Sequence, residues 1–249
     1  MTVMSDWPGP PVQVIGMGMA AGGLSHAAQA ALAQADLLIG AAQHLAAFPK
    51  LAAEKRTYPS PMSGLCEVLR ANADRRIALL ASGDPLFYGI SQTLLRHLSP
   101  EHLAFHPAVS SVQAAFARLG KPWHQAHMVS LHGRPLASLR AVLQGNRQYA
   151  VLTDRDSSPT AIARILAETG FGESDLWIAE DLGMPNERFR HFRAADLAVA
   201  AVEFSPLHVV ILETRGPGGV LPEFPGIADE AFSTGAEPGK GLLSKREVR

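Results

Sequence analysis

The stretch "LLASGDPLFYGISQTLL", Leu79–Leu95, indicates the fold class because it runs from an apolar strand through a loop into a helical pattern. The apolar run "IALLA" leads directly into Ser82, Gly83, Asp84 and Pro85. Glycine lets the backbone turn tightly, and proline fixes the φ angle of the outgoing chain. Ligands of parallel α/β sheets bind at the carboxyl ends of strands. We therefore expect the Asp84 carboxylate to point into a ligand site, the alternative being a helix cap.

Short apolar runs alternate with helical patterns over most of the chain. Strands are expected at residues 12–18, 36–40, 77–81, 103–106, 127–131, 149–153, 176–180 and 207–212. Helices are expected at residues 24–35, where Ser25 can cap, and at 64–72, 90–97, 111–119, 136–143, 160–168 and 194–200. This alternation predicts an α/β protein with largely parallel sheets covered by helices.

Composition restricts the class of protein. The chain has 249 residues, 47% of them hydrophobic, and a formal net charge of −1, which suits one large core or two smaller ones. Lysine and arginine are scattered, so no nucleic-acid partner is expected. Cys66 is the single cysteine, which excludes an internal disulfide and suits a reducing cytoplasm. The chain shows neither a signal-peptide pattern nor a membrane-length apolar run, so no membrane association is expected.

A change of domain is expected near "LGKPWHQ", Leu119–Gln125, which combines glycine, proline and polar residues halfway along the chain. We expect an N-terminal α/β domain at residues 11–121 and a C-terminal α/β domain at residues 122–215. Residues 216–249 are rich in glycine and proline and lack a clear period until the last few residues. That segment is expected to be a linker or tail.

A glycine-rich loop follows the first expected strand, in "VIGMGMAAGGLS". A dinucleotide-binding G-x-G-x-x-G turn needs a third glycine where Ala21 stands, and an acid where the second strand ends at Gly40. Asp36 lies at the start of that strand instead. The loop can be a structural turn or a small-molecule site of another type. A nicotinamide-dependent oxidoreductase and a binding half without activity remain the alternatives from other classes.

The segment "ASGDPLFYG" resembles the G-D-P loop of the tetrapyrrole methylases, the S-adenosylmethionine-dependent enzymes of sirohaem and cobalamin synthesis. Two further segments resemble that family's first domain, "VIGMGMAAGGLSHAAQAALAQADLLIGAAQHL" and "PAVSSVQAAFARLG". The segments "VSLHGR", "VLTDRDSSPTAIARIL", "IAEDLGMPNERF" and "SPLHVVILE" resemble the second domain of one branch. That branch comprises the precorrin-6Y and cobalt-precorrin-7 methyltransferases, which methylate C5. The resemblance extends from Val12 to Glu213.

The resemblance implies a homodimer of two-domain α/β chains, and the single cysteine suits a cytoplasmic location. S-adenosyl-L-methionine would lie in a cleft between the domains, with S-adenosyl-L-homocysteine as product and a precorrin as substrate. Many members have a proline and an acid where this chain has Met19 and Ala21, so the first loop departs from the pattern. Matched by position, the cofactor-binding candidates are Met19, Ser82, Gly83, Asp84, Phe87, Ser110, Ser111, Leu152, Thr153 and Glu180.

The acceptor implied by the resemblance carries acetate and propionate groups, which arginine binds with two parallel hydrogen bonds. The substrate-binding candidates are His132, Arg134, Arg155 and Arg188, with Arg190 beside them. Each can equally be a solvated surface residue. No Ser-His-Asp or Cys-His arrangement is visible, and the sequence singles out no catalytic base. No metal site is expected, because neither cysteines nor a cluster of acids accompany His124 and His127.

The end of the chain, "LPEFPGIADEAF" followed by "LLSKREVR", resembles the connection inside bifunctional precorrin-6Y enzymes. In those enzymes a second domain methylates C15 and decarboxylates the C12 acetate. We expect this chain to lack that domain and to retain C5 methylation. Within the family the rivals are uroporphyrinogen-III methylation and an RNA-directed branch, for which the chain has too little basic surface.

Overall fold

The computed structural model describes residues 7–19, 23–154, 156–216 and 218, which fall into two compact units. The first unit lies within Met1–Trp123 and also includes Asp181–Glu187. The second lies within His124–Glu180 and Arg188–Arg249. The segment Asp181–Glu187 thus groups with the first unit although the chain on both sides of it belongs to the second. Most of the expected tail, residues 219–249, and Arg155 lie outside the described residues.

The first unit contains a five-stranded sheet with the order β3-β2-β4-β1-β5, in which every pair is parallel. Its strands are β1 (Val12–Gly16), β2 (Leu37–Gly40), β3 (Glu54–Thr57), β4 (Ile77–Ala81) and β5 (Leu103–His106). The register pairs Gly16 with Ala81 and Ile15 with His106. The loops that follow β1, β4 and β5 therefore leave from the same edge of the sheet.

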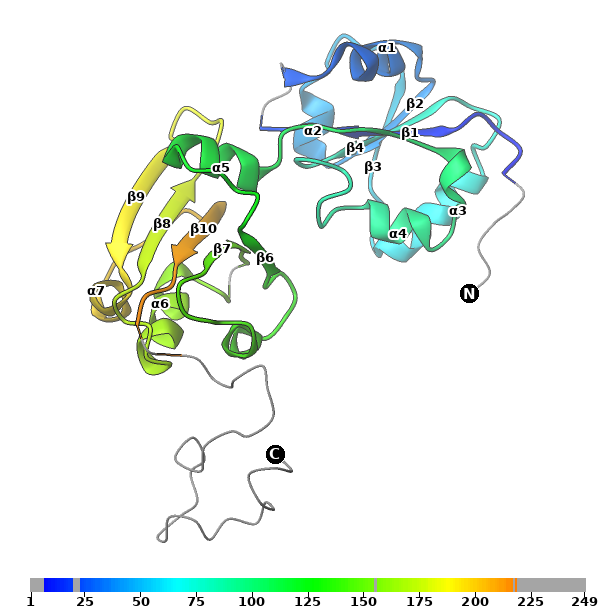
Figure 1. Cartoon of the computed structure of the whole chain (residues 1–249). Coiled ribbons are helices and arrows are strands. Elements are labelled where there is room, and N and C mark those ends of the chain that lie inside the picture. The colour runs from blue at the N-terminus through cyan, green and yellow to red at the C-terminus, as the bar shows by residue number, and fades with distance from the viewer. Residues whose placement is uncertain (1–6, 20–22, 155, 217, 219–249) are drawn as a thin grey trace, which may run out of the picture. The chain divides into compact units, whose positions relative to one another are not determined.

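Helices cover both faces of this sheet, as Figure 1 shows for α1 on one side and for α3 and α4 on the other. The helices of the unit are α1 (His26–Gln34), α2 (Ala42–Ala46), α3 (Leu65–Arg70), α4 (Ser91–Leu95) and α5 (Ser111–Leu119). The alternation of a strand decides which face each side chain covers. Leu38 and Leu80 pack with α1 and α2, whereas Ile39 and Leu79 pack with α3 and α4. The expected cap of α1 is confirmed, because the Ser25 hydroxyl accepts from the Ala28 amide at 3.2 Å.

The second unit contains a mixed sheet with the order β6-β7-β10-β8-β9. Its strands are β6 (His127–Ser130), β7 (Gln148–Leu152), β8 (Asp175–Glu180), β9 (Arg188–Arg193) and β10 (His208–Glu213). Only β6 and β7 are parallel, and the three other pairs are antiparallel. The expectation of largely parallel sheets is wrong here. The short segment between β8 and β9 brings the chain straight back beside β8, which an antiparallel pair permits without a crossover helix.

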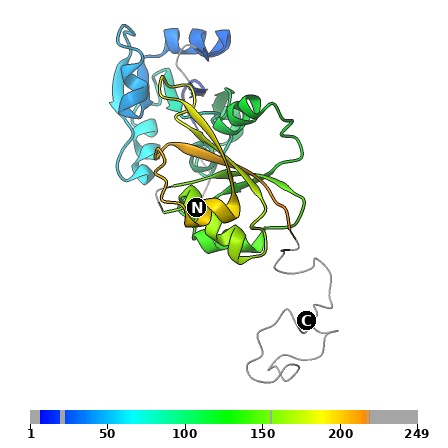
Figure 2. The ribbon, with the colours of Figure 1, turned by 90° about the vertical axis from the view of Figure 1, so that its left-hand side faces the viewer.

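The core of the second unit lies on one face of this sheet, between its apolar side chains and α6 (Pro159–Glu168) and α7 (Ala194–Val199). The two helices lie side by side against the sheet in the turned view (Figure 2). Tyr149 and Val151 of β7 and Val210 of β10 are fully buried there. The helix expected at residues 136–143 is instead a 3-10 helix, η4 (Leu136–Ala141).

Two strands and one α-helix escaped the sequence analysis, namely β3, β9 and α2. The strand β3 reads "EKRT" and β9 reads "RFRHFR", and both lie at the edges of their sheets. Edge strands carry charged residues because one side faces solvent, so their sequences do not show the apolar pattern of a buried strand. Within the described ranges, none of the helices is long and apolar enough to cross a bilayer.

Candidate active site

Three loops meet at the carboxyl edge of the first sheet. After β1 the Gly18 amide donates to the Gly83 carbonyl oxygen at 3.1 Å, which joins the first loop to the loop after β4. A Cβ atom on Gly16 would lie 2.7 Å from that same oxygen and 2.9 Å from the Cβ of Ala108, in the loop after β5. Real Cβ atoms do not approach other atoms this closely. Glycine at position 16 is therefore what lets the three loops pack together.

Asp84 ties the second of these loops to the third. Its Oδ1 accepts from the Leu86 amide at 2.9 Å, and its Oδ2 accepts from the Ala108 amide at 3.1 Å. Aspartate commonly accepts from the amide two residues ahead in a turn, but the bond to Ala108 spans two loops. Both carboxylate oxygens of Asp84 thus turn back onto the chain, and its expected contact with the cofactor stays a prediction.

The rest of the G-D-P loop presents an open backbone and apolar rings. Gly83 has a φ of 59°, and the atom closest to a Cβ built there is the Ser110 Cα at 3.8 Å. Tyr88 has a φ of 51° and packs edge-on against Phe87, with 5.0 Å between the ring centroids. A positive φ at a bulky residue costs about 1–3 kcal/mol, and such strain collects at functional sites. Tyr88 also exposes 42% of its surface and Leu86 exposes 56%.

The two serines of the third loop have different environments. Ser110 caps α5 in a capping box, in which its hydroxyl accepts from the Gln113 amide at 3.2 Å and its own amide donates to the Gln113 side chain at 2.9 Å. Ser110 is buried, whereas Ser111 is half-buried at the first position of the helix. The Ser110 hydroxyl is thus occupied by the helix it begins, and Ser111 is the serine whose hydroxyl is better placed for a ligand.

Met19 lies against the segment Asp181–Glu187. A Cβ on Gly183, which has a φ of 78°, would lie 2.8 Å from the Met19 carbonyl oxygen, so the two backbones are in close contact. Glu187 fixes the segment, because its Oε2 accepts from the Gly183 amide at 2.7 Å and its Oε1 from Arg118 Nε at 2.5 Å. The Arg118 hydrogen bond, helped by the Gly183 amide, lowers the pKa of Glu187. Met19, in the first loop, thus lies against chain that follows β8.

Asp154 has a similar role in the second unit, where it joins the loops after β6 and β7. Its Oδ2 accepts from the Gly133 amide at 2.9 Å, and its Oδ1 accepts from the Ser157 hydroxyl at 2.6 Å. The Ser157 side chain, followed by the Gly133 amide, lowers the pKa of Asp154 to about 2. His132 and Arg134 flank Gly133 and are both exposed. Asp154 therefore fixes the turn that carries these two substrate-binding candidates.

Leu152 and Thr153 lie at the carboxyl end of β7. The Leu152 carbonyl oxygen accepts from the Leu131 amide at 2.8 Å, and the Thr153 hydroxyl donates to the His208 carbonyl oxygen at 3.1 Å. Both residues are half-buried. These hydrogen bonds hold the ends of β7 and its neighbouring strands together, and the exposed parts of the two residues remain available to a ligand.

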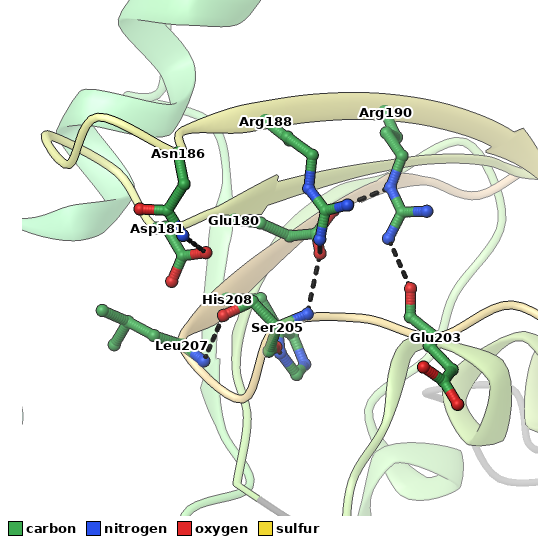
Figure 3. Close-up of polar contacts among 9 residues, drawn as sticks. All are labelled: Glu180, Asp181, Asn186, Arg188, Arg190, Glu203, Ser205, Leu207 and His208. Atoms are coloured by element: carbon green, nitrogen blue, oxygen red, sulfur yellow. Dashed lines mark hydrogen bonds and ion pairs between the residues drawn. The ribbon is translucent and has the colours of Figure 1, made fainter.

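Glu180 is fully buried at the end of β8 and is surrounded by donors (Figure 3). Its Oε1 accepts from Arg188 Nη2 at 3.0 Å and from the Ser205 amide at 2.8 Å. Its Oε2 accepts from Arg190 Nε at 2.7 Å, and Arg190 also stacks on Phe204, 4.3 Å from the ring centroid. A buried carboxylate needs such partners to offset its lost hydration. Glu180 and Arg188, assigned to different ligands by the sequence, are thus bonded to each other.

The structure brings the sequence candidates together in groups. Met19, Ser82, Gly83, Asp84, Phe87, Ser110 and Ser111 belong to the loops of the first unit, and Leu152, Thr153, Glu180, His132, Arg134 and Arg188 belong to the second. Sequence reasoning missed the Ala108 amide and His44, whose Nε2 lies 3.4 Å from the Ser82 hydroxyl. The position of His44 just after a buried strand was the available signal. No three His, Cys, Asp or Glu side chains gather as metal ligands in the described parts of either unit.

Comparison with known families identifies the architecture. The sequence model of the tetrapyrrole (corrin/porphyrin) methylases matches residues 11–198. The chain belongs to the tetrapyrrole methylase family. Tetrapyrrole methylases use S-adenosylmethionine, so the nicotinamide alternative falls. The structure agrees with this, because β2 ends at Gly40, where a ribose-binding acid would stand, and Asp36, just before β2, is bonded to Arg76 at 2.6 Å.

Two relatives of this tetrapyrrole methylase match over most of its length. It is 37% identical to the cobalt-precorrin-7 C(5)-methyltransferase of Salmonella typhimurium, over 81% of this chain and 98% of that protein. It is 33% identical to the precorrin-6Y C(5,15)-methyltransferase [decarboxylating] of a Sinorhizobium species, over 99% of this chain but only 58% of that protein. The chain thus spans little more than half the length of the Sinorhizobium relative.

Solved structures share the fold of this tetrapyrrole methylase. The uroporphyrin-III C-methyl transferase of Thermus thermophilus, complexed with S-adenosyl homocysteine, superposes with a TM-score of 0.61 at 23% identity. The superposition covers 82% of this chain and 97% of that one. At this identity the likeness concerns the fold alone.

Proposed function

We propose that this protein transfers a methyl group from S-adenosyl-L-methionine to C5 of a precorrin in cobalamin biosynthesis and releases S-adenosyl-L-homocysteine. The observation that carries the proposal is the 37% identity to the Salmonella cobalt-precorrin-7 C(5)-methyltransferase over 98% of that protein's length. The exposed, strained loop after β4 supports it, because it lies where ligands of parallel sheets bind.

The three loops of the first unit suit the methyl donor. The space beside Gly83 lets a ligand approach the backbone, since among the described residues a Cβ there would have only the Ser110 Cα within 4 Å. Leu86, Tyr88 and Val109 add exposed apolar surface for an adenosine or a macrocycle. When bound, the donor supplies a methyl group on a positively charged sulfur. Ser82, Gly83, Phe87 and Ser111 would contact it, while Asp84 would hold the loops that form its site.

The contribution of the protein to the reaction is position and the exclusion of water. The acceptor carbon of a reduced tetrapyrrole is already electron-rich, so no nucleophilic side chain is needed. Holding two reactants in line can contribute about 7–11 kcal/mol to the lowering of the barrier. Holding the donor and the acceptor in line requires ordered loops. The bonds from Asp84 to the Leu86 and Ala108 amides provide that order.

Cationic side chains of the second unit would bind the acceptor's carboxylates. Arg134 is exposed beside the Asp154 turn, and Arg188 exposes 56% of its side chain while one nitrogen bonds Glu180. The remaining guanidinium donors of Arg188 can bind a carboxylate of the substrate. We assign Arg134, Arg188 and His132 to this role. Arg155 stays a prediction from the sequence, as do the contacts of Leu152, Thr153 and Glu180 with the donor.

The direct test is incubation of the purified protein with S-adenosylmethionine and precorrin-6B or its cobalt analogue. We expect a product with one additional methyl group and no loss of carbon dioxide, which mass spectrometry reports, and NMR should place that methyl group at C5. Uroporphyrinogen III serves as the competing acceptor. Methylation of uroporphyrinogen III alone, or of a carbon other than C5, would overturn the proposal.

The assembly and context of the enzyme are also proposals. From the family resemblance we propose a cytoplasmic homodimer with domain limits at residues 11–121 and 122–215. Light scattering on the purified protein tests the dimer. We further propose that C15 methylation and decarboxylation, named for the Sinorhizobium relative, need sequence beyond the part of that relative which this chain matches. The absence of carbon dioxide release in the incubation tests that assignment.

A further inference from the structure

His44 lies at the carboxyl edge of the first sheet but has no role in the site described above. It belongs to α2, which starts immediately after β2. Its Nε2 lies 3.4 Å from the Ser82 hydroxyl, which follows the neighbouring strand β4. A separation of this length suits a hydrogen bond that tightens when a ligand arrives, because such bonds are often long before substrate binds.

The two ring nitrogens of His44 have different surroundings. Nδ1 is shielded from solvent and has no hydrogen-bond partner among the described residues. Nε2 faces Ser82, which is exposed. Burial lowers the pKa of His44, and the neighbouring Leu80 carbonyl only partly opposes this. Burial thus favours the neutral imidazole, and the nitrogen that can exchange a proton with the loop is Nε2.

The titratable groups around α2 have other partners. The Tyr58 hydroxyl donates to the Leu80 carbonyl oxygen at 3.0 Å, and Lys55 of β3 donates to the Leu51 carbonyl oxygen at 3.3 Å. Glu54 of β3 is paired with Arg56 at 2.5 Å and with Arg75 at 2.9 Å. Both Asp84 oxygens accept from backbone amides. His44 is thus the neutral base adjoining the G-D-P loop.

We propose that Ser82 and His44 form a proton relay that removes the proton from the methylated carbon, an inference that rests on the proposed function. The acceptor carbon forms the new carbon–carbon bond with its own electron pair, and sulfur keeps the pair of the bond that breaks. The carbon then gives its C–H proton to the Ser82 oxygen, while the Ser82 proton passes to His44 Nε2. The electron pair of that C–H bond restores the conjugation of the macrocycle, and bulk water later takes the proton from the imidazolium.

The test compares His44→Gln with His106→Gln. His106 is a matched control, since burial also lowers its pKa but its Nε2 is already bonded to Gln13 at 2.8 Å. For His44→Gln we expect kcat for precorrin methylation to fall about 100-fold or more, with KM changed little. Ser82→Ala should give a similar loss of kcat. For His106→Gln we expect kcat within about twofold of the wild type.

Two readouts separate the relay from a structural role. The wild-type kcat should rise with pH through the lowered pKa of His44, because the base must be neutral, and this limb should vanish in His44→Gln. Independently of activity, an NMR titration should place the His44 ring pKa below the ordinary value of about 6.5. Calorimetry with S-adenosylhomocysteine should give equal affinities for the wild type and His44→Gln, which shows that the variant is folded.

The outcomes distinguish the relay from the proposed function. A wild-type protein that methylates no precorrin would overturn the proposed function and the relay with it. A wild type that methylates C5, with His44→Gln as fast or with an unchanged pH limb, would overturn the relay alone. A His44 ring that titrates at its ordinary value would do the same.

Discussion

At the scale of single residues, Asp84 and Asp154 perform equivalent tasks in the two units. Each follows a strand closely and accepts from an amide in a loop after another strand of the same sheet, Ala108 after β5 in one case and Gly133 after β6 in the other. An aspartate at such a place suggests a ligand contact to a reader of the sequence. The structure gives both carboxylates backbone partners, and each aspartate thereby orders loops of its own unit.

For Asp84→Ala we expect the dissociation constant for S-adenosylmethionine to rise about tenfold or more, because hydrogen bonds to a charged group contribute about 1.5–3 kcal/mol. The loss follows from freeing the Leu86 and Ala108 amides. Calorimetric titration measures the constant. Asp74→Ala is the control, because Asp74 is an exposed aspartate of the same unit. Equal affinity in Asp84→Ala and wild type would remove Asp84 from the donor site.

Glu180→Ala should destabilise the second unit by about 3–5 kcal/mol, the usual cost of removing one partner from a buried ion pair. The substitution leaves the half-buried Arg190 and the Ser205 amide without their acceptor. Urea unfolding followed by circular dichroism measures the difference. Glu203→Ala is the control, since its side chain is exposed and Arg190 contacts only its carbonyl oxygen, so its effect should stay under about 0.5 kcal/mol. Similar values for both variants would contradict this account.

At the scale of elements, two adjacent serines at the start of helix α5 have different environments. Ser110 closes the capping box and Ser111 begins the helix. We expect Ser110→Ala to lower the free energy of unfolding by about 1 kcal/mol, the typical cost of losing an N-cap. Ser111→Ala should leave that free energy within about 0.5 kcal/mol of the wild type and weaken S-adenosylmethionine binding. Urea unfolding measures the stability of the two variants, and calorimetry measures their affinity for S-adenosylmethionine. If Ser111→Ala lost stability and Ser110→Ala lost affinity, the two assignments would have to be reversed.

Elements with an apolar interior were predictable from sequence, whereas edges and partners were not. β4 reads "IALLA" and is buried throughout, so its pattern stands out. β9 alternates arginine with aromatic residues and lies at the edge of its sheet beside β8. Its sequence therefore lacks the apolar run by which a buried strand is predicted. The antiparallel direction of β10 depends on its pairing with β7 and β8, and the local sequence of a strand does not predict its partners. The bond from Asp84 to Ala108 likewise depends on tertiary approach.

The candidate site was therefore predicted in part. The loop positions followed from strand ends and from the family resemblance, because Ser82, Gly83 and Ser110 all follow recognisable strands. The hydrogen-bond partners of the individual side chains could not be predicted from the sequence. The Ser110 hydroxyl caps a helix, and Glu180 balances two arginines, which only the folded contacts reveal.

At the scale of the whole molecule, acid should weaken both units over one range of pH. Hydrogen bonds from Arg76 lower the pKa of Asp36 and those from Arg118 lower the pKa of Glu187, while Asp154 has a pKa of about 2. A carboxyl group with a lowered folded pKa adds stability above its unfolded pKa, and this is lost as pH falls through the folded value. For Asp154 the range runs from about 3.9 down to about 2.

We expect the urea midpoint to hold steady near neutral pH and to fall progressively from about pH 4 downward. Asp154→Asn should make this fall shallower, since the amide does not titrate, and Asp74→Asn should leave it unchanged. These groups are partly exposed to solvent, so the effect of each is modest and should shrink in high salt. A midpoint that rises on acidification would contradict the assignment of these pairs.

The segment Asp181–Glu187 has a consequence for how the polypeptide can be divided. The chain passes from one unit to the other at Trp123, returns at Asp181 and leaves again at Arg188. A single backbone cut near residue 123 would therefore not separate the two units cleanly. The downstream fragment carries Glu187, which accepts a hydrogen bond from Arg118 in the upstream fragment. Swapping halves between homologous enzymes at that junction would take Arg118 from one parent and the segment Asp181–Glu187 from the other. A working chimera must therefore take Arg118 and this segment from the same parent.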